Sequence, residues 1–504
     1  MSSVVKPSTA QRISHYARFP PTALSLAQMA QFGQTPSTAT VYRAAQFMAD
    51  ELPVRLAHRV RELENLPEGL GESPSIQRVL GWYVKSFEDI VDMQQYAQER
   101  LPDTVRANLL QVSSESLSMP AKQFNDNVKD DYIKPTLKTL KALEDGSNPN
   151  DHINEHHNEA HHKSFFGSLK DRLFSGFGGS PLTKFDGDQK WPPEVHEYLD
   201  AFKDCLTKVR KRHDAVVTTM AQGIKEYSEK HRLKQGSSAN GSLDHHRNNN
   251  HYMNYNYDFG DTNGEIVKRH GMIEPGFHEQ RIQSFLDRFF MSRIGIRMLI
   301  GQQLALMEGR FAPDYVGIIC TNTGVKETIQ HAVTLAEEIC EDTYGLYEGP
   351  KVIIECDPDL RFMYIPAHLS HMIFETVKNS LRAVVEKYGV DVDSKTYPPV
   401  TIVVGDGSED ITIRISDKGG GIPRSVQQRV WMYNYTTVKE PPKIGPEFSE
   451  PMMGAPMAGF GYGLPITRLY ARYFGGDVVL QSIEGYGTDV YMHLNKLSTR
   501  ELIF

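Results

Sequence analysis

Four polar residues on one predicted helix are the first candidates for chemistry. Residues 371–388 contain good helix formers and neither proline nor glycine. Within them, four side chains are spaced i, i+3, i+4 and i+7 and therefore share one stripe of the helix: Glu375, Lys378, Asn379 and Arg382. A carboxylate, an amine, an amide and a guanidinium in one line predict a charged ligand held against the helix. The alternative is a solvated helix face with ion pairs, which is common on surface helices.

A first glycine-rich turn, residues 417–423, follows a predicted strand at 411–416. Glycine lets the backbone approach a ligand closely and adopt positive φ, here at Gly419 and Gly421. A carboxylate at the end of the strand, Asp417, can accept a hydrogen bond from the N–H of an exocyclic amine. A tight turn without a ligand is the alternative for this segment.

A second glycine-rich turn opens a predicted helix at 466–474. Gly459, Gly461 and Gly463 alternate, Pro465 suits a first helical turn, and Gly475 suits the stop. Free N–H groups and the positive end of the helix dipole would form a phosphate cradle. The turn is not a P-loop, because no Lys-Ser/Thr pair follows its last glycine. A third turn, Gly487-Thr488, precedes a predicted final strand at 489–494.

The elements that position these residues show two kinds of sequence pattern. Before residue 310 the pattern is helical: residues 42–100 with a new start at Pro53, one long helix at 198–229, and another at 280–308. This predicts an antiparallel helical bundle. After Pro313, β-branched runs at 352–356, 400–404, 411–415 and 477–480 alternate with helices, which predicts an α/β sandwich.

The expected organisation is therefore α+β, with an N-terminal antiparallel helical bundle followed by an α/β sandwich. We expect residues 15–310 to form the bundle, with polar insertions at about 117–195 and 233–258, and residues 311–504 to form the sandwich. Residues 1–14 are expected to be a targeting or disordered segment. The first acidic residue is Asp50, and an acid-poor, Ser- and Arg-bearing terminus is typical of a transit peptide.

Composition excludes several classes of protein. A net charge of −8 argues against a general nucleic-acid binder. No apolar run approaches the roughly 18 residues of a membrane-spanning helix. The four cysteines are scattered, which indicates buried thiols in a reducing compartment. Five histidines between 152 and 162 have spacing that could ligate zinc, but their polar surroundings favour a flexible insertion.

In this order, the helix and the three turns resemble the ATP-binding fold shared by histidine kinases, type II topoisomerases, HSP90-type chaperones and MutL proteins, the GHKL superfamily. Within it, Glu375-x-x-Lys378-Asn379-x-x-Arg382 and the turn 459–465 are similar to the mitochondrial 2-oxo acid dehydrogenase kinases, chiefly the pyruvate dehydrogenase kinases. The similarity extends into the helical half, at residues 16–19, 51–57, 212–214, 220–223 and 285–289.

The resemblance implies a role for each motif. Asn379 would coordinate Mg²⁺ between the phosphates, Asp417 would read the adenine amino group, and Thr488 would lie near the base. Residues 424–458 would be a lid over the nucleotide. The other implied nucleotide-binding residues are Arg382, Gly419, Gly421, Gly459, Phe460, Gly461, Tyr462, Gly463 and Leu464.

The implied catalytic residues are Glu375, His213 and Lys378. Glu375 would be the general base for a serine hydroxyl, since phosphoryl transfer depends mainly on positioning and charge neutralisation. By resemblance His213, from the helical domain, would orient or tune Glu375, and Lys378 would supply positive charge. A core-packed histidine is the alternative for His213.

The implied function is an ATP-dependent protein serine kinase that inactivates the α subunit of the dehydrogenase in the mitochondrial pyruvate dehydrogenase complex. The bundle would be a regulatory and lipoyl-docking domain. Implied cofactors are ATP and Mg²⁺, with K⁺ as a further candidate. Implied partners are that α subunit, the lipoyl domain of the acyltransferase core and a second copy in a homodimer. The matrix is the implied location, without nucleic acid or membrane insertion.

Two alternatives remain at this level. The short ending at Phe504 is closer to the branched-chain 2-oxo acid dehydrogenase kinase, whereas residues 287–293 and 470–474 favour the pyruvate branch. A histidine-kinase-like protein or nucleotide-binding scaffold of the same fold is the alternative of a different class. Residues 296–303 contain no phospho-accepting His, and Gln303 stands where related kinases often have one.

Overall fold

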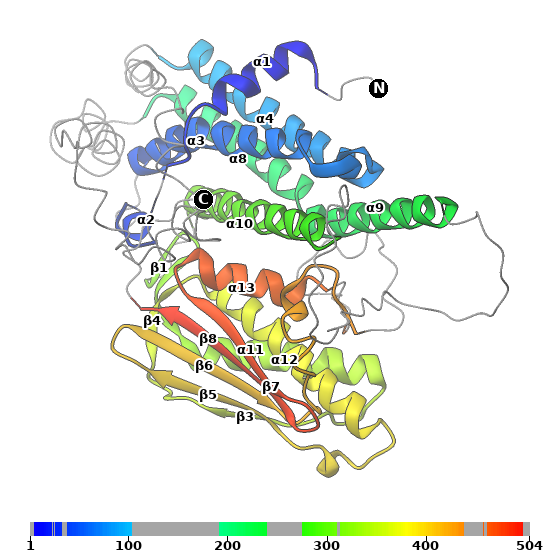
Figure 1. Cartoon of the computed structure of the whole chain (residues 1–504). Helices are drawn as coiled ribbons and strands as arrows, with labels where there is room; N and C mark the ends of the chain where they lie inside the picture. The colour runs from blue at the N-terminus through cyan, green and yellow to red at the C-terminus, as the bar shows by residue number, and fades with distance from the viewer. Residues whose placement is uncertain are drawn as a thin grey trace, which may run out of the picture.

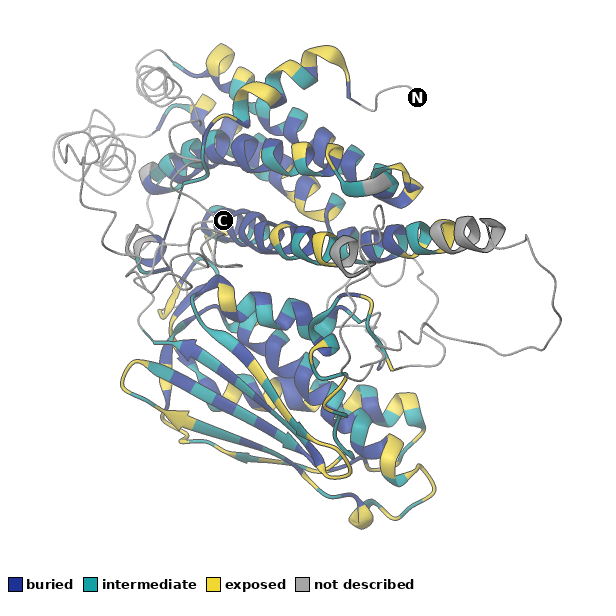
Figure 2. Ribbon diagram, in the orientation of Figure 1, coloured by how far each residue is buried: buried dark blue, intermediate teal, exposed yellow. Residues whose placement is uncertain are grey.

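The computed structural model describes residues 5–22, 24, 26–32, 38–102, 191–238, 275–309, 313–437, 457 and 461–496. Within these residues a helical half lies against an α/β half (Figure 1). Both halves have buried apolar interiors, and their exposed residues lie on the outer surfaces (Figure 2). The predicted α+β class is confirmed.

The described part of the helical half consists of helices, most of them long. Its elements are α1 Pro7–Tyr16, α2 Leu26–Phe32, α3 Thr38–Glu64, η1 Pro67–Glu72, α4 Pro74–Arg100, α8 Pro193–Arg212, α9 Val216–Ser238 and α10 Pro275–Glu308. Helix α3 packs against α4 and α10, and α4 packs against α8 and α9. None of the described helices is both long enough and apolar enough to span a bilayer.

Pro53 lies inside α3, so the predicted new helix start at this residue is wrong. A proline in a helix leaves the carbonyl of residue i−4 without its N–H donor. Here that carbonyl belongs to Ala49, and the side-chain amide of Gln94 on α4 donates to it at 2.8 Å. A contact from a neighbouring helix thus replaces the missing hydrogen bond.

The single helix predicted at 198–229 is also wrong, because residues 213–215 separate α8 from α9. The guanidinium of Arg293 on α10 donates to the carbonyl oxygens of His213 at 2.9 Å and of Asp214 at 3.5 Å. These carbonyls near the end of α8 are therefore satisfied by a distant side chain.

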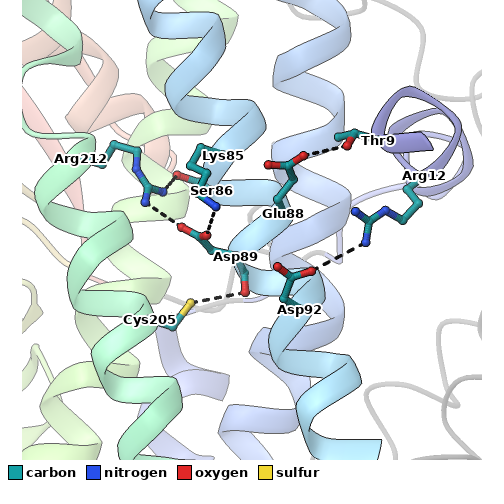
Figure 3. Close-up of polar contacts among 9 residues, drawn as sticks. All are labelled: Thr9, Arg12, Lys85, Ser86, Glu88, Asp89, Asp92, Cys205 and Arg212. Atoms are coloured by element: carbon teal, nitrogen blue, oxygen red, sulfur yellow. Dashed lines mark hydrogen bonds and ion pairs between the residues drawn. The ribbon is translucent and has the colours of Figure 1, made fainter. Parts of the chain in front are cut away.

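Residues 7–14 are part of a packed helix, so the disordered-segment interpretation does not hold for them. Ile13 of α1 is buried, and Thr9 donates to Glu88 of α4 at 2.7 Å. Arg12 of α1 forms an ion pair with Asp92, which also lies on α4 (Figure 3). A targeting role for the N-terminus stays a prediction.

The described part of the C-terminal half contains two sheets, three α-helices and two short 3-10 helices. Its elements are β1 Tyr315–Val316, β2 Ile319–Gly324, α11 Val325–Tyr344, β3 Val352–Glu355, β4 Arg361–Tyr364, α12 Pro366–Tyr388, η4 Ser394–Thr396, β5 Val400–Asp406, β6 Asp410–Asp417, η5 Arg429–Trp431, α13 Gly463–Tyr473, β7 Asp477–Ile483 and β8 Gly487–Asn495. The larger sheet has the order β3-β5-β6-β8-β7, and the smaller has the order β1-β2-β4. Helix α11 and strands β1, β2 and β4 are not predicted by the sequence patterns above.

Helices α11, α12 and α13 lie together on one side of the larger sheet (Figure 1). Helix α12 packs between α11 and α13, while α13 also contacts α10 of the helical half. Strand β6 pairs with β8 so that Asp417 lies opposite Thr488. The polar stripe of α12 and the glycine-rich turns are therefore brought to one region of this half.

Candidate functional site

Helix α12 carries the polar stripe around which the candidate site is built. An apolar stripe with helical spacing, residues 373, 377, 381, 384 and 385, is buried. The polar stripe is covered as well: the side chains of Lys378 and Glu375 are only 4% and 13% exposed, and Lys378 Nζ lies 2.9 Å from Glu375 Oε1. The solvated-face interpretation is therefore wrong for these two residues.

Glu375 is held as a carboxylate by its neighbours on α12. Burial acts to raise the pKa of Glu375, but Lys378 and His371 outweigh it, and the pKa falls below its ordinary value. A lowered pKa keeps the carboxylate ionised at neutral pH, as a proton acceptor must be. His371 was missed from the sequence, although it stands one turn before Glu375 on the same helix.

His213 lies in the helical half, at the end of α8. Its Nε2 lies 3.0 Å from Ser86 Oγ on α4, and its ring stacks on Tyr83 with 4.5 Å between centroids. Arg212 donates to the same Ser86 oxygen and to Asp89 (Figure 3). Burial, and then Arg293, lower the pKa of His213 to about 3, so it is neutral.

No contact between His213 and Glu375 is present among the described residues. Within the described residues, the imidazole that helps to lower the pKa of Glu375 is that of His371, and the carboxylate accepts a hydrogen bond from Lys378. The predicted pairing of His213 with Glu375 therefore lacks a contact, and a catalytic role for His213 stays a prediction. Core packing, the alternative, describes its surroundings.

Asn379 and Arg382 continue the polar stripe toward the surface. Asn379 is half-buried, and its amide forms no hydrogen bond with a described residue. Arg382 Nε lies 2.7 Å from Glu386 Oε1, and its Nη2 donates to Thr437 at 3.2 Å. An amide oxygen is a suitable Mg²⁺ ligand, and a guanidinium suits a phosphate.

Within the described residues, no group of three His, Cys, Asp or Glu side chains could hold a metal by itself. Nucleotide-bound Mg²⁺ does not need one, because it usually takes one or two protein ligands together with phosphate oxygens and water. Asn379, next to the ionised Glu375, fits that pattern. The histidines at 152–162 lie outside the described residues.

The first glycine-rich turn packs directly on α12. Asp417 is buried, and its Oδ1 accepts the Gly419 N–H at 2.8 Å. Burial raises the pKa of Asp417, while hydrogen bonds from Gly419, Ser380 and Thr488 oppose that rise. A Cβ on Gly419 would collide with Ala383 of α12, and Gly421 has φ of +69°. Both positions therefore require glycine.

Ser482 links this turn to the final strands and was missed from the sequence. Its Oγ accepts the Ile422 N–H at 2.7 Å and lies 2.9 Å from Thr488 Oγ1. It also donates to Gly487 at 3.1 Å. No sequence signal could have found it, since it occupies an ordinary position in a strand.

The second glycine-rich turn meets Glu375. Gly463 is the first residue of α13, and a Cβ on it would lie 2.5 Å from Glu375 Oε2. Gly461 has φ of +79°, Tyr462 is buried and Leu464 is half-buried. The carboxylate and the N-terminus of α13 therefore belong to one site, where the helix dipole favours anions.

The structure thus gathers the α12 stripe and the parts of three turns around one helix: Glu375, Lys378, Asn379, Arg382, Asp417, Gly419, Gly421, Gly461, Tyr462, Gly463, Leu464 and Thr488. It does not bring His213 to them. Gly459 and Phe460 lie outside the described residues, as do residues 438–456 and 458 of the predicted lid.

Two family models match the chain. The model for mitochondrial branched-chain α-ketoacid dehydrogenase kinase covers residues 23–320. The model for histidine kinase-, DNA gyrase B- and HSP90-like ATPases covers residues 364–498. The second match includes α12 and all three glycine-rich turns.

Curated relatives resemble the chain over nearly its full length. A mitochondrial pyruvate dehydrogenase (acetyl-transferring) kinase of Schizosaccharomyces pombe is 36% identical, covering 98% of both chains. One of Arabidopsis thaliana is 33% identical over 94% of this chain and 91% of its own. Human isozyme 3 is 31% identical over 98% of this chain and 88% of its own.

Proposed function

The chain belongs to the mitochondrial 2-oxo acid dehydrogenase kinase family, and we propose that it is an ATP-dependent protein kinase of the mitochondrial pyruvate dehydrogenase complex. The observation that carries the proposal is the contact between Glu375 and Gly463. This contact places an ionised carboxylate next to a glycine-rich turn at a helix N-terminus, which is a type of turn that binds phosphates. Relatives from a fungus, a plant and an animal bear the same activity in their names.

In the proposed mechanism, the protein positions the reactants and neutralises charge. Backbone N–H groups of the turn before α13 bind the phosphates, and Asp417 accepts a hydrogen bond from the adenine amino group. Asn379 and the phosphates would hold Mg²⁺, which supplies charge neutralisation when bound. Arg382, near the stripe's outer end, adds positive charge.

Glu375 then accepts the proton of a substrate serine hydroxyl. At the same time the serine oxygen forms a bond to the γ-phosphorus of ATP, and the bond from that phosphorus to ADP breaks. The hydroxyl is a poor nucleophile, so a positioned base adds a factor of about 10²–10⁴. The lowered pKa of Glu375 keeps the base form present at neutral pH. Lys378, bonded to the same carboxylate, fixes its orientation and partly offsets its charge.

The pyruvate dehydrogenase α subunit is the proposed protein substrate. The relatives above are named for pyruvate dehydrogenase, whereas the matching model of the helical half is named for the branched-chain kinase. Residues 287–293 and 470–474, which lie in α10 and around the end of α13, resemble the pyruvate branch.

We also propose a homodimer in the mitochondrial matrix that docks to the lipoyl domain of the acyltransferase core. Support for self-association comes from β7, an edge strand of the larger sheet. Its Val479 and Ile483, which are four positions apart and therefore on one face of the strand, expose apolar side chains that a second copy would cover. K⁺ remains a candidate ion for the nucleotide site.

The deciding experiment transfers γ-labelled phosphate from Mg-ATP to purified pyruvate dehydrogenase or branched-chain dehydrogenase. We expect labelled serine on the pyruvate dehydrogenase α subunit, and only background with Glu375→Gln. Preferential labelling of the branched-chain enzyme would change the substrate assignment. Absence of label on both enzymes would overturn the kinase proposal, and phosphohistidine on the protein itself would favour the histidine-kinase class.

A further inference from the structure

One tyrosine connects the helical half with the second glycine-rich turn. Tyr433, in the segment after η5, is buried, and its hydroxyl donates to Asp287 Oδ1 on α10 at 2.8 Å. The Tyr433 N–H donates to Gln283 Oε1 at 2.8 Å, and Gln283 Nε2 donates back to the Tyr433 carbonyl at 3.4 Å. Side chains of α10, in the helical half, therefore bind both the backbone and the side chain of Tyr433.

The ring of Tyr433 continues this connection by packing. It lies 5.4 Å from the ring of Phe290 on α10 and 5.3 Å from that of Tyr462, measured between centroids. Phe290 and Tyr462 also meet edge to face, at 5.8 Å and 90°. Each ring of the three touches the other two, an arrangement that favours one relative orientation.

Tyr462 is the residue immediately before Gly463 in the turn. The neighbouring Gly461 approaches the backbone of Tyr435 so closely that a Cβ would collide with its carbonyl. Residues 433–435 and 461–462 therefore pack on each other as well as on α10. A glycine turn has no side chains of its own to hold it, so its position must come from such neighbours.

We propose that Asp287 and Gln283 are positioning residues for nucleotide binding, which hold the Gly461–Gly463 turn against Glu375 through Tyr433 and Tyr462. The inference rests on the proposed ATP-dependent function. It assigns to the helical half a direct part in the affinity for ATP. Asp287, Gln283 and Tyr433 need not touch the nucleotide, because preorganisation of the turn is enough to raise affinity.

The test measures ATP affinity directly in the full chain, by calorimetry without protein substrate. Tyr433→Phe removes the hydroxyl but keeps the ring, and Asp287→Ala removes its acceptor. Each is expected to weaken ATP binding about 3- to 10-fold, the effect of one lost buried hydrogen bond. The double variant should bind no more weakly than the weaker single variant, since both changes break one interaction.

Two further variants separate positioning from general stability. Asp287→Asn keeps an oxygen for the tyrosine hydroxyl and should restore most of the affinity. Tyr397→Phe removes another tyrosine bond of the same half, from its hydroxyl to the Gly389 carbonyl at 2.7 Å. It should lower the thermal midpoint as much as Tyr433→Phe does, while leaving ATP affinity unchanged.

The kinetic readout should match, with KM for ATP rising more than kcat falls. Unchanged ATP affinity in both Tyr433→Phe and Asp287→Ala would overturn the inference, as would an equal loss in Tyr397→Phe. If the protein binds ATP with this pattern of variants but labels no dehydrogenase serine, the positioning inference stands and the proposed substrate function fails.

Discussion

The protein contains two clusters of covered polar side chains, and they differ in what completes them. In the helical half, Ser86 Oγ is bonded by both His213 and Arg212, and Asp89 by Arg212 and Lys85. On α12, the one side chain of the described residues that bonds to Glu375 is Lys378, and the other oxygen of Glu375 faces the backbone of Gly463. The first cluster is closed by side chains, whereas the second is bounded by glycines. Buried polarity alone therefore does not mark a ligand site; a glycine turn beside the buried carboxylate does.

The largest expected effect separates the two clusters by chemistry. Glu375→Gln removes the proposed base and should lower phosphoryl transfer by about 10²–10⁴-fold while ATP binding is retained. Labelled phosphate transfer and calorimetry measure the two quantities. Glu327→Gln, which removes a surface carboxylate paired with Arg361, is the matched control and should keep full activity. Full activity in Glu375→Gln would remove its role as base.

A second prediction tests whether the glycines define the site. Gly463→Ala would place a Cβ 2.5 Å from Glu375 Oε2, which must displace the carboxylate or the turn. A displacement of this size can cost about 10²-fold in rate. Gly81→Ala, on α4, meets nothing within 4 Å and should leave transfer unchanged. It should also raise stability by up to about 1 kcal/mol, by helix propensity. Equal transfer rates for the two variants would refute the prediction.

A third prediction concerns the metal. Asn379→Ala should weaken ATP binding about tenfold in the presence of Mg²⁺, the effect of losing a ligand to a charged group. It should have little effect in EDTA. Asn65→Ala, which loses a surface bond to the Arg61 carbonyl, is the control. An equal loss with and without Mg²⁺ would assign Asn379 to the nucleotide rather than to the metal.

The smallest effect tests the closed cluster. The pKa of His213 falls from its ordinary 6.5 to about 3, chiefly through burial and then through Arg293. As the pH falls, the imidazole of His213 is therefore protonated in the unfolded chain before it is protonated in the folded chain. The contribution of His213 to the free energy of unfolding is complete above about pH 6.5. It is lost as the pH falls toward 3, by at most about 1.4 kcal/mol per pH unit.

His213→Gln should reduce this loss, measured as the pH dependence of the free energy of unfolding, whereas the exposed His196→Gln should not. An unchanged slope in His213→Gln would contradict the buried neutral state. A shifted pH profile of phosphoryl transfer in this variant would instead support the catalytic role that the resemblance implies.

Local sequence patterns predicted much of the fold. The apolar stripe of α12, the β-branched strands of the larger sheet and the glycines after β6 and before α13 all depend on residues within a few positions of each other. The amide of Gln94 that satisfies the Ala49 carbonyl is 45 residues away, and Asp287 is 146 residues from Tyr433. Such contacts leave no periodicity in the sequence, so Pro53 and the break after α8 were misread.

The sequence alone thus determined the class of fold, the family and the chemical types present on α12, because each follows from residue identity at short spacing. Only the tertiary structure decided which groups meet. It placed His213 against Ser86 and Gly463 against Glu375, and it joined α10 to the glycine turn through Tyr433. The physical reason is that packing, and not order along the chain, sets which buried polar groups satisfy one another.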